Sequence, residues 1–497
     1  MLFWLLLLGL ITYFIVQRSV AGLTRTPTWI LWLVMMTPAL IWSGWTWVYG
    51  EASEPPLPLI IGPFVICPIL YWLLIQWGRI PEPPKSQAAD AQPQSPVAKS
   101  INDSPDQRAN LRPIDKIEES QLQSCFPWSI YYLQNIEYRP QAVICRGHLR
   151  TSSAVAYETI RENIERQFGD RFLVVFQEGL NGKPFFALVP NPQAQQAAKG
   201  QPEKLTRPIL ALALLVITLF TTTLVGTVIA GVPVETGREL IDNPALLLKG
   251  LPYALSLITI LGIHELGHYL TARFYRIRTT LPYFIPVPFF LGTFGAFIQM
   301  RSPVPNRKVL FDVGIAGPLA GLVVTLPFLW WGLAHSSVVA LSPKPGLLDI
   351  NALNPGSSLL LAVFSKLALG SALTATTAIK LHPVAVAGCL GLIVTALNLM
   401  PVGQLDGGHI VHAMFGQRAG AAIGQIARLL VLALALIQSQ LLLWAIILFF
   451  MPIVDEPALN DVSELDNRRD LWGLLALGLL LLIILPAPKA VIQLLGV

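Results

Sequence analysis

The sequence predicts an all-α polytopic membrane protein with about 8–10 transmembrane helices and a re-entrant hairpin, plus a small soluble α+β domain. Hydrophobic residues make up 54% of the 497 residues, and the mean hydropathy is +0.59. Charged residues make up only 13%, against roughly 25% in ordinary soluble domains. These values disfavour a soluble enzyme, a disordered protein and a nucleic-acid binder. The net charge of +5 is the modest basic excess that positive-inside loops give to membrane proteins.

Apolar runs long enough to cross a bilayer, about 20 residues each, predict the membrane helices. They lie at 1–17, 29–49, 57–77, 208–231, 251–275, 308–334, 383–401, 428–451 and 471–495. A further run at 358–380 includes Ser365, Lys366 and Ser371, so an interfacial or buried helix is as good an interpretation as a tenth span. The distribution of Lys and Arg predicts an outside N-terminus and a cytoplasmic segment 78–207.

Composition shifts along the chain predict five parts. A three-helix membrane segment (1–78) precedes a disordered linker rich in Pro, Gln and Ala (79–113). A small soluble α+β domain (114–200) leads into a membrane core (205–455), and a C-terminal part (456–497) holds the last transmembrane helix.

The soluble segment carries signals for strands and one helix. Residues 129–150 read as one or two strands, and 152–168 have helical periodicity with Ser152 or Ser153 as the N-cap. A hairpin is expected across residues 180–183. Cys125 and Cys145 lie in this segment and could form a disulfide or stay reduced. The small size suits binding or regulation better than catalysis.

His264-Glu265-Leu266-Gly267-His268 is an H-E-x-x-H motif inside an apolar helix. The i, i+4 spacing puts both imidazoles on one helix face, one turn apart, where they can bind one zinc ion. Glu265 is adjacent and can act as general base on a metal-bound water. Ionisable residues in the membrane are costly unless they are paired or functional, which favours a metal site over buried structural histidines.

A catalytic zinc needs a third protein ligand, and the sequence narrows the choice. The soluble H-E-x-x-H-x-x-G-x-x-H pattern is excluded, because Thr271 and Phe274 stand where it needs a glycine and a third histidine. The thermolysin-type pattern, with a Glu some 20 residues downstream, is excluded because no Asp or Glu occurs from 266 to 311. Asp406 follows an apolar helix that runs in the same direction as 251–275, and Pro401 breaks that helix. Gly403, Gly407 and Gly408 let the backbone turn inward. Asp406 is therefore the predicted ligand, whereas Asp312 reads as an interfacial ion-pair partner or a helix N-terminal charge.

The two motifs together resemble the site-2 protease family of intramembrane zinc metalloproteases. Residues 398–409, NLMPVGQLDGGH, match that family's N-x-x-P-x-x-x-x-D-G signature, and the resemblance covers roughly 205–455. It implies that His264, His268 and Asp406 bind Zn2+ and that Glu265 is the catalytic base. It also implies that Asn398 contacts the substrate or the oxyanion near the metal.

The N-terminal half resembles one branch of this family. Several N-terminal helices, a long polar segment and Gly147-His148-Leu149-Arg150 look like the chloroplast and cyanobacterial ethylene-dependent gravitropism-deficient and yellow-green proteins. That branch has G-N-L-R, and His148 stands here in place of Asn. The residue types favour an exposed strand-end position for His148 over a metal site.

Three other features are expected near the motifs. Residues 281–300 carry three prolines and two glycines, which indicates a re-entrant hairpin. Its strand 292–298 either pairs with an unwound substrate or is a packing loop. Gly317 and Gly321 have the spacing that lets a neighbouring helix pack closely. His409 and His412 are expected to make polar contacts near the site rather than to bind the metal.

These features predict hydrolysis of peptide bonds in or near transmembrane segments. The expected partners are the lipid bilayer and membrane-protein substrates with helix-destabilised segments, without nucleic acid. The predicted location is the plasma or thylakoid membrane, with the active site near the cytoplasmic face. A silent zinc-binding scaffold or chaperone is the alternative, although it would not need Glu265. A metal transporter is disfavoured because the H-E-x-x-H helix has no visible inverted repeat.

Overall fold

The computed structural model of the protein describes most of the chain, which is mainly helical. The described ranges are 26–49, 56–78, 114–139, 142–179, 182–194, 207–232, 242–287, 291–340, 353–374, 377–437 and 441–495, with a few isolated positions. Two compact units are present, residues 1–102 and residues 103–497.

The first unit contains the packed helix pair α2 (Thr28–Tyr49) and α3 (Leu57–Trp77). Both helices have the bounds expected from the apolar runs 29–49 and 57–77. A proline stands in the first turn of α3, where its missing N–H costs no helical hydrogen bond. The expected span 1–17, apart from isolated positions, and the expected linker 79–113 lie outside the described residues.

The second unit begins with a four-stranded antiparallel sheet of order β1-β2-β4-β3. Its elements are α5 (Lys116–Ser124), β1 (Tyr131–Arg139), β2 (Ala142–Leu149), α6 (Ser153–Phe168), β3 (Phe172–Glu178) and β4 (Pro184–Pro190). The aromatic side chains of Tyr131, Phe176 and Phe186 are fully buried in its core. The two strands, the helix with Ser152 at its N-cap position and the hairpin all occur where the sequence predicts them.

All four cysteines are free and buried. Cys125 and Cys145 both lie in the core of the small domain, so the reduced alternative is the one that the structure contains. Burial, reinforced by the neighbouring Cys125, raises the pKa of the Cys145 thiol to about 12. The thiol therefore remains protonated near neutral pH and is a packing group.

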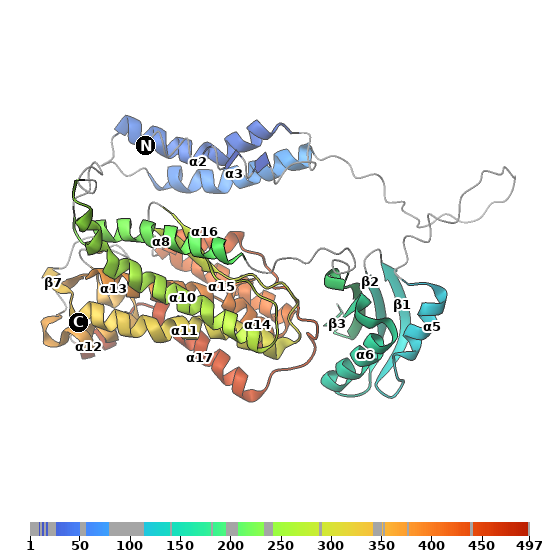
Figure 1. The fold of residues 1–497 in the computed structure, drawn as a ribbon. Helices are drawn as coiled ribbons and strands as arrows, with labels where there is room; N and C mark the ends of the chain where they lie inside the picture. Colours follow the sequence, from blue (N-terminus) through green and yellow to red (C-terminus); the bar gives the residue numbers. More distant parts are fainter. Residues whose placement is uncertain are drawn as a thin grey trace. The chain divides into compact units, whose positions relative to one another are not determined.

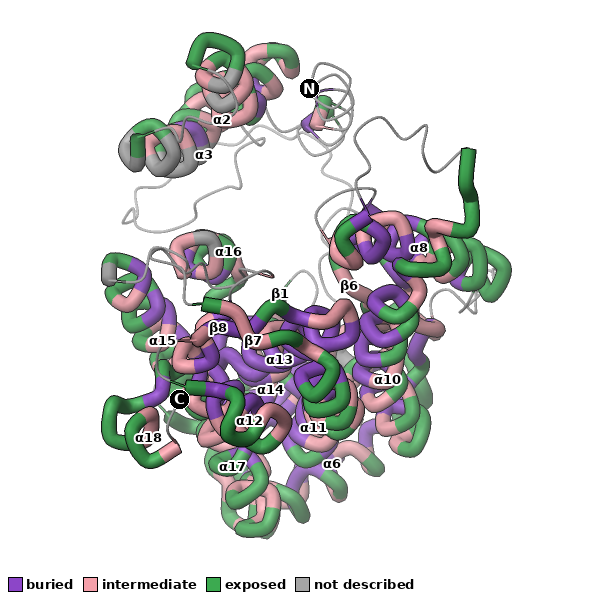
Figure 2. The backbone as a smooth tube through the Cα atoms, turned by 90° about the vertical axis from the view of Figure 1, so that its left-hand side faces the viewer, coloured by how far each residue is buried: buried purple, intermediate pink, exposed green. Residues whose placement is uncertain are grey.

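The rest of the second unit is a bundle in which α10 and α11 pack against each other and both contact α13 (Figure 1). The principal helices are α8 (Pro208–Ile229), α10 (Leu251–Phe274), α11 (Arg307–Ala334) and α13 (Pro383–Leu399). By length and composition, five helices of the described chain can cross a membrane, or six if α17 and α18, bent by 78°, form one span. Buried residues concentrate on the inner helices, while the outer faces of the bundle are exposed (Figure 2).

The C-terminal half departs from the predicted spans. The run 428–451 falls on two helices, α15 (Gln417–Ile437) and α16 (Leu442–Phe450), and residues 438–440 between them lie outside the described residues. Helix α15 begins before the predicted span, because the Ala-rich but more polar stretch from 417 favours a helix that a hydropathy window misses. The run 471–495 is α17 (Asn467–Ile484) and α18 (Lys489–Leu495), since Pro486 and Pro488 interrupt the helix. Residues 358–380 hold the 11-residue α12 (Leu359–Leu369), a 3-10 turn (Gly370–Ala372) and β8 (Thr377–Lys380), which pairs with β7 (Ser337–Ala340).

The predicted hairpin within 281–300 is present as β5 (Tyr283–Pro286) paired antiparallel with β6 (Thr293–Phe297). Hydroxyl groups from two helices donate hydrogen bonds to backbone carbonyl oxygens just before β6. The Tyr253 hydroxyl donates to the Leu291 carbonyl at 3.0 Å, and the Thr221 hydroxyl donates to the Gly292 carbonyl at 2.7 Å. These bonds replace the water that an irregular backbone would need.

Candidate metal centre

Three side chains that are distant in the sequence meet in the helical bundle. The Asp406 Oδ2 atom lies 3.4 Å from Nε2 of His264 and 3.3 Å from Nε2 of His268. The two Nε2 atoms are 3.3 Å apart. Both histidines are almost fully buried. Among the described residues, this is the one group of three or more His, Cys, Asp or Glu side chains that could hold a metal ion.

The triangle formed by these three atoms fits zinc. Zinc binds His nitrogen and carboxylate oxygen at about 2.0–2.1 Å in a tetrahedron, which separates two ligand atoms by roughly 3.3–3.4 Å. The observed separations, 3.3 to 3.4 Å, have that length. Three protein ligands leave a fourth position for water or substrate, as in a catalytic site.

A supporting hydrogen bond fixes the orientation of one imidazole. Nδ1 of His268 lies 2.8 Å from the carbonyl oxygen of Val313 on α11 and donates to it. With its proton on Nδ1, His268 presents the Nε2 lone pair to the centre. The neighbouring helix therefore selects the tautomer that can bind a metal.

Two glycines of α11 make room for the histidines. A Cβ atom on Gly317 would lie 2.0 Å from Nε2 of His268, and a Cβ atom on Gly321 would lie 3.1 Å from Cβ of His264. The predicted close packing is confirmed, and the partner is the face of α10 that carries the two candidate ligand histidines. No signal in the sequence connects these glycines to the imidazoles, because it does not show which helix packs against α11.

Asp406 is the first residue of α14 (Asp406–Phe415), which follows the turn after α13. The turn is tight, because a Cβ atom on Gly407 would lie 2.0 Å from the Leu399 carbonyl oxygen. The break after Leu399 and the inward turn thus occur as the sequence predicts. The side chain of Asp406 is 15% exposed.

Glu265 lies beside the candidate ligands on α10 and is buried. The backbone N–H of Ile298, the residue after β6, donates a hydrogen bond to its carboxylate. The hairpin strand therefore ends at this carboxylate.

Asn398, near the end of α13, also reaches the centre. Its Nδ2 atom is 3.1 Å from Nε2 of His264, the atom that faces Asp406. The amide is half-buried and lies at the ligand atoms rather than along the helix surface.

Asp312 does not join the centre. Its carboxylate forms a two-pronged ion pair with Arg469, with both contacts at 2.7 Å, and accepts a hydrogen bond from the Tyr275 hydroxyl at 2.5 Å. The prediction of an ion pair for Asp312 is confirmed, and its partner comes from α17.

His409 and His412 of α14 point to carboxylates away from the centre. Nδ1 of His409 is 2.9 Å from Asp455, and Nδ1 of His412 is 2.7 Å from the same oxygen. His409 and Asp455 line a polar cavity of about 710 Å³ together with Ile298 and Gln404. This cavity reaches the residue that bonds Glu265, so it is the candidate route for water.

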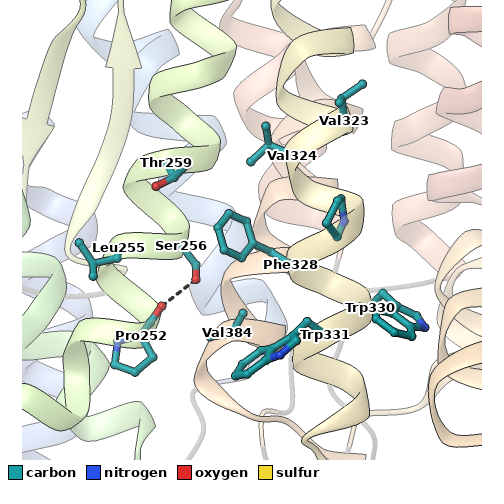
Figure 3. A pocket seen from close by; sticks show the side chains of 11 residues that line it. Pro252, Leu255, Ser256, Thr259, Val323, Val324, Phe328, Trp330, Trp331 and Val384 are labelled. Carbon is teal, nitrogen blue, oxygen red and sulfur yellow. Dashed lines mark hydrogen bonds between the residues drawn. The ribbon is translucent and has the colours of Figure 1, made fainter.

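A second cavity, of about 770 Å³, lies between α10 and α11 and has an apolar lining (Figure 3). Its one short polar contact, from the Ser256 hydroxyl to the Pro252 carbonyl oxygen at 2.7 Å, is internal to α10. None of the candidate ligands lines it. The cavity therefore lies apart from the candidate ligands.

The Gly147–Arg150 segment lies at the end of β2. A Cβ atom on Gly147 would lie 2.1 Å from the Tyr132 carbonyl oxygen, so only glycine fits where β2 crosses β1. The Arg150 guanidinium stacks 3.8 Å above the Trp128 ring. His148 is exposed on β2, the position that the residue types favoured.

Comparison with known proteins agrees with this geometry. Residues 252–439 match peptidase family M50. The chain is 31% identical over 372 residues to a protein of Arabidopsis thaliana named probable zinc metalloprotease EGY2, chloroplastic, which covers 73% of this chain and 64% of that protein. It is 29% identical over 382 residues to the probable zinc metalloprotease EGY1, chloroplastic, of Oryza sativa subsp. japonica, covering 72% and 65%.

The chain spans just under two thirds of the length of these curated relatives. The resemblance inferred from the HELGH and NLMPVGQLDGGH motifs is confirmed, because the matched region includes both. The chain thus contains a peptidase family M50 domain, that of the site-2 proteases, and is a homologue of the EGY group of probable chloroplast zinc metalloproteases.

Proposed function

We propose that this protein is an intramembrane zinc metalloprotease that hydrolyses peptide bonds in or near the transmembrane segments of membrane-protein substrates. One observation carries the proposal: three ligand atoms stand 3.3 to 3.4 Å apart, at the spacing of a tetrahedral zinc site, with Glu265 next to them. His264, His268 and Asp406 would hold Zn2+. A structural zinc site would not need a buried carboxylate beside three ligands.

Each group at the centre has a separate role in the proposed hydrolysis. When bound, zinc supplies a Lewis acid that polarises the substrate carbonyl and lowers the pKa of water toward about 7. Glu265 accepts the proton of the attacking water and returns it to the leaving amine. The amide of Asn398 donates a hydrogen bond to the developing oxyanion.

The hairpin supports an extended substrate. Within the described residues, β5 is the one strand that pairs with β6, and β6 leads directly to Ile298. A substrate segment that pairs with β6 is guided to Glu265. A helical carbonyl is hydrogen-bonded within its helix, so the substrate must unwind. Segments with helix-destabilising residues are therefore the expected partners.

The bilayer is the second partner. Five or six helices of the described chain are long and apolar enough to span it, and the shorter apolar α13 lies among them. The proposed topology has about 8–10 spans with β5 and β6 as a re-entrant hairpin. The site lies near the cytoplasmic face of a plasma or thylakoid membrane. The polar cavity at Ile298 and Gln404 supports this position, since water must reach Glu265.

The test compares wild type with Glu265→Gln by quantitative membrane proteomics. A substrate should accumulate uncut in the variant, and the purified protein in liposomes should cleave that substrate only with Glu265 present. His335→Gln, at an exposed histidine at the end of α11, is the control and should cleave normally. Zinc retention in a wild type that cleaves nothing would instead favour the scaffold alternative, and zinc flux would favour a transporter.

A further inference from the structure

Four ionisable side chains form a cluster beyond the metal centre, and three of them are buried. They are His409 and His412 on α14 and Asp455 and Asp461 in the loop after α16. His412 is bracketed, with Nδ1 2.7 Å from Asp455 and Nε2 2.8 Å from Asp461. His412 is 1% exposed, Asp455 7% and Asp461 8%. Buried charges persist only where they are paired in this way.

This cluster is not a second metal site. Both ring nitrogens of His412 face carboxylate oxygens, so both carry protons and neither offers a lone pair. The group of candidate ligands found among the described residues does not include it. His412 is therefore an imidazolium that bridges two carboxylates.

The bridge fixes the helix that begins with the metal ligand. Asp406 and His412 are six residues apart on α14, roughly 9 Å along the axis at 1.5 Å per residue. Arg307 reinforces the attachment, because its Nε donates to the Ala413 carbonyl oxygen at 2.8 Å. A helix held at its last turn cannot rotate or slide without moving Asp406.

The other end of the bridge belongs to a segment that is hydrogen-bonded on both sides. Towards the small domain, the Phe176 N–H donates to the Leu459 carbonyl at 2.6 Å, and the Asp461 N–H donates to the Phe176 carbonyl at 2.9 Å. Towards the bundle, the N–H groups of Leu459 and Asn460 donate to carbonyls just before α11, at 2.9 Å each. Residues 459–461 thus extend the β3 edge of the small sheet.

We propose that His412, held between Asp455 and Asp461, is a positioning residue for Asp406 and couples metal binding to the attachment of the small domain at β3. The connection runs from Phe176 through Asp461 and His412 to α14. It deepens the proposed function and depends on a metal at the centre. Coupling of this kind is reciprocal, so the metal also strengthens the attachment of 459–461 to the small domain.

The first experiment measures zinc affinity by chelator competition on the full-length protein in detergent. His412→Gln and Asp461→Asn should each weaken zinc binding about 10- to 100-fold, the usual effect of removing a group that supports a metal ligand. The double variant His412→Gln/Asp461→Asn should lose less zinc affinity than the product of the two single-variant losses, because both substitutions remove the same contact. His335→Gln is the matched control and should bind zinc as wild type does.

Rescue separates positioning from general destabilisation. Asp461→Glu keeps the charge and should restore most of the affinity that Asp461→Asn loses. The visible absorption of the Co2+-substituted protein should change in His412→Gln and stay unchanged in His335→Gln, since the bands report ligand geometry. Wild-type affinity and spectrum in His412→Gln, together with a lowered unfolding temperature, would overturn the inference.

The second experiment follows hydrogen exchange at the amides of Phe176 and Asp461 with and without zinc. In wild type, removal of zinc should speed exchange at both amides, and in His412→Gln exchange should be fast in both states. Equal exchange rates with and without zinc in wild type would refute the coupling. A wild type that binds no zinc would refute the proposed function itself. A wild type that binds zinc, together with a His412→Gln variant whose exchange rates equal those of wild type, would refute only the coupling.

Discussion

Gly317 on α11 lies directly against His268, since a Cβ atom at this glycine would stand 2.0 Å from the Nε2 atom of the imidazole. The room for one candidate metal ligand is therefore provided by the absence of a side chain on the neighbouring helix. Substitutions that leave every ligand in place can then still damage the centre.

Gly317→Ala should reduce zinc binding although it changes no ligand. The methyl group must displace His268 or push the helices apart, and such overpacking costs about 1–3 kcal/mol. Zinc content of the purified protein, measured by atomic emission, checks this. Gly478→Ala on α17 is the control, because a Cβ atom there meets nothing within 4 Å. Full zinc content in Gly317→Ala would show that α11 can shift to admit the methyl group without reducing zinc binding.

Asp406→Asn should weaken zinc binding by more than the ~100-fold that loss of a supporting contact costs, because it removes a charged ligand. Asp312→Asn removes an equally polar carboxylate that pairs with Arg469. It should retain zinc and lose only stability. Isothermal titration of the metal-free proteins distinguishes the two. Equal affinities would remove Asp406 from the ligand set.

Gly147→Ala should destabilise the small domain. Its Cβ atom would lie 2.1 Å from the Tyr132 carbonyl oxygen, so the β1 and β2 strands must separate, at a cost of about 1–3 kcal/mol. Faster hydrogen exchange at β1 amides in the full-length protein is the expected readout. His148→Asn, at the exposed neighbouring position, should change stability by less than about 0.5 kcal/mol. A larger effect of His148→Asn would give that side chain a role that its exposure does not suggest.

Stability should depend on pH through His412. Burial disfavours its charged form, but the hydrogen bonds to Asp455 and Asp461 outweigh burial and raise the pKa of His412 to about 9. A raised pKa stabilises the fold fully below the unfolded value of 6.5, and this contribution is lost as pH rises through about 9. Arg307 and His409 also lie at this cluster, and the carboxylates of Glu178, Glu464 and Asp470 act on Arg307.

At acidic pH, stability is limited by the protonation of Asp455. Burial raises its pKa, but the hydrogen bonds from His409 and His412 dominate and lower it below 3.8, so its contribution is lost only in acid. Thermal unfolding followed from pH 5 to 10 should show a declining midpoint above pH 6.5. His412→Gln should flatten that decline. A wild-type midpoint that is constant up to pH 10 would contradict the ionic bridge.

The sequence predicts the centre better than it predicts the helices at the C-terminal end. The i, i+4 spacing of His264 and His268 is local geometry, and the scarcity of acids makes Asp406 stand out. The junction of α17 with α18 is less visible, because a hydropathy window averages across a break. The role of Gly317 and the partners of His412 depend on which segments pack together, and spacing along the chain does not contain that information.

The strand-like contact of Phe176 with residues 459–461 has a consequence for the order in which the protein is made. The small domain is synthesised early, yet its β3 edge finds its partner only after the whole M50 region has been translated. Until then this edge presents unpaired N–H and C=O groups, the feature by which sheets associate wrongly. The sheet edge is therefore covered only after synthesis of the M50 region, and ribosome-bound chains that stop before residue 459 should be the aggregation-prone ones.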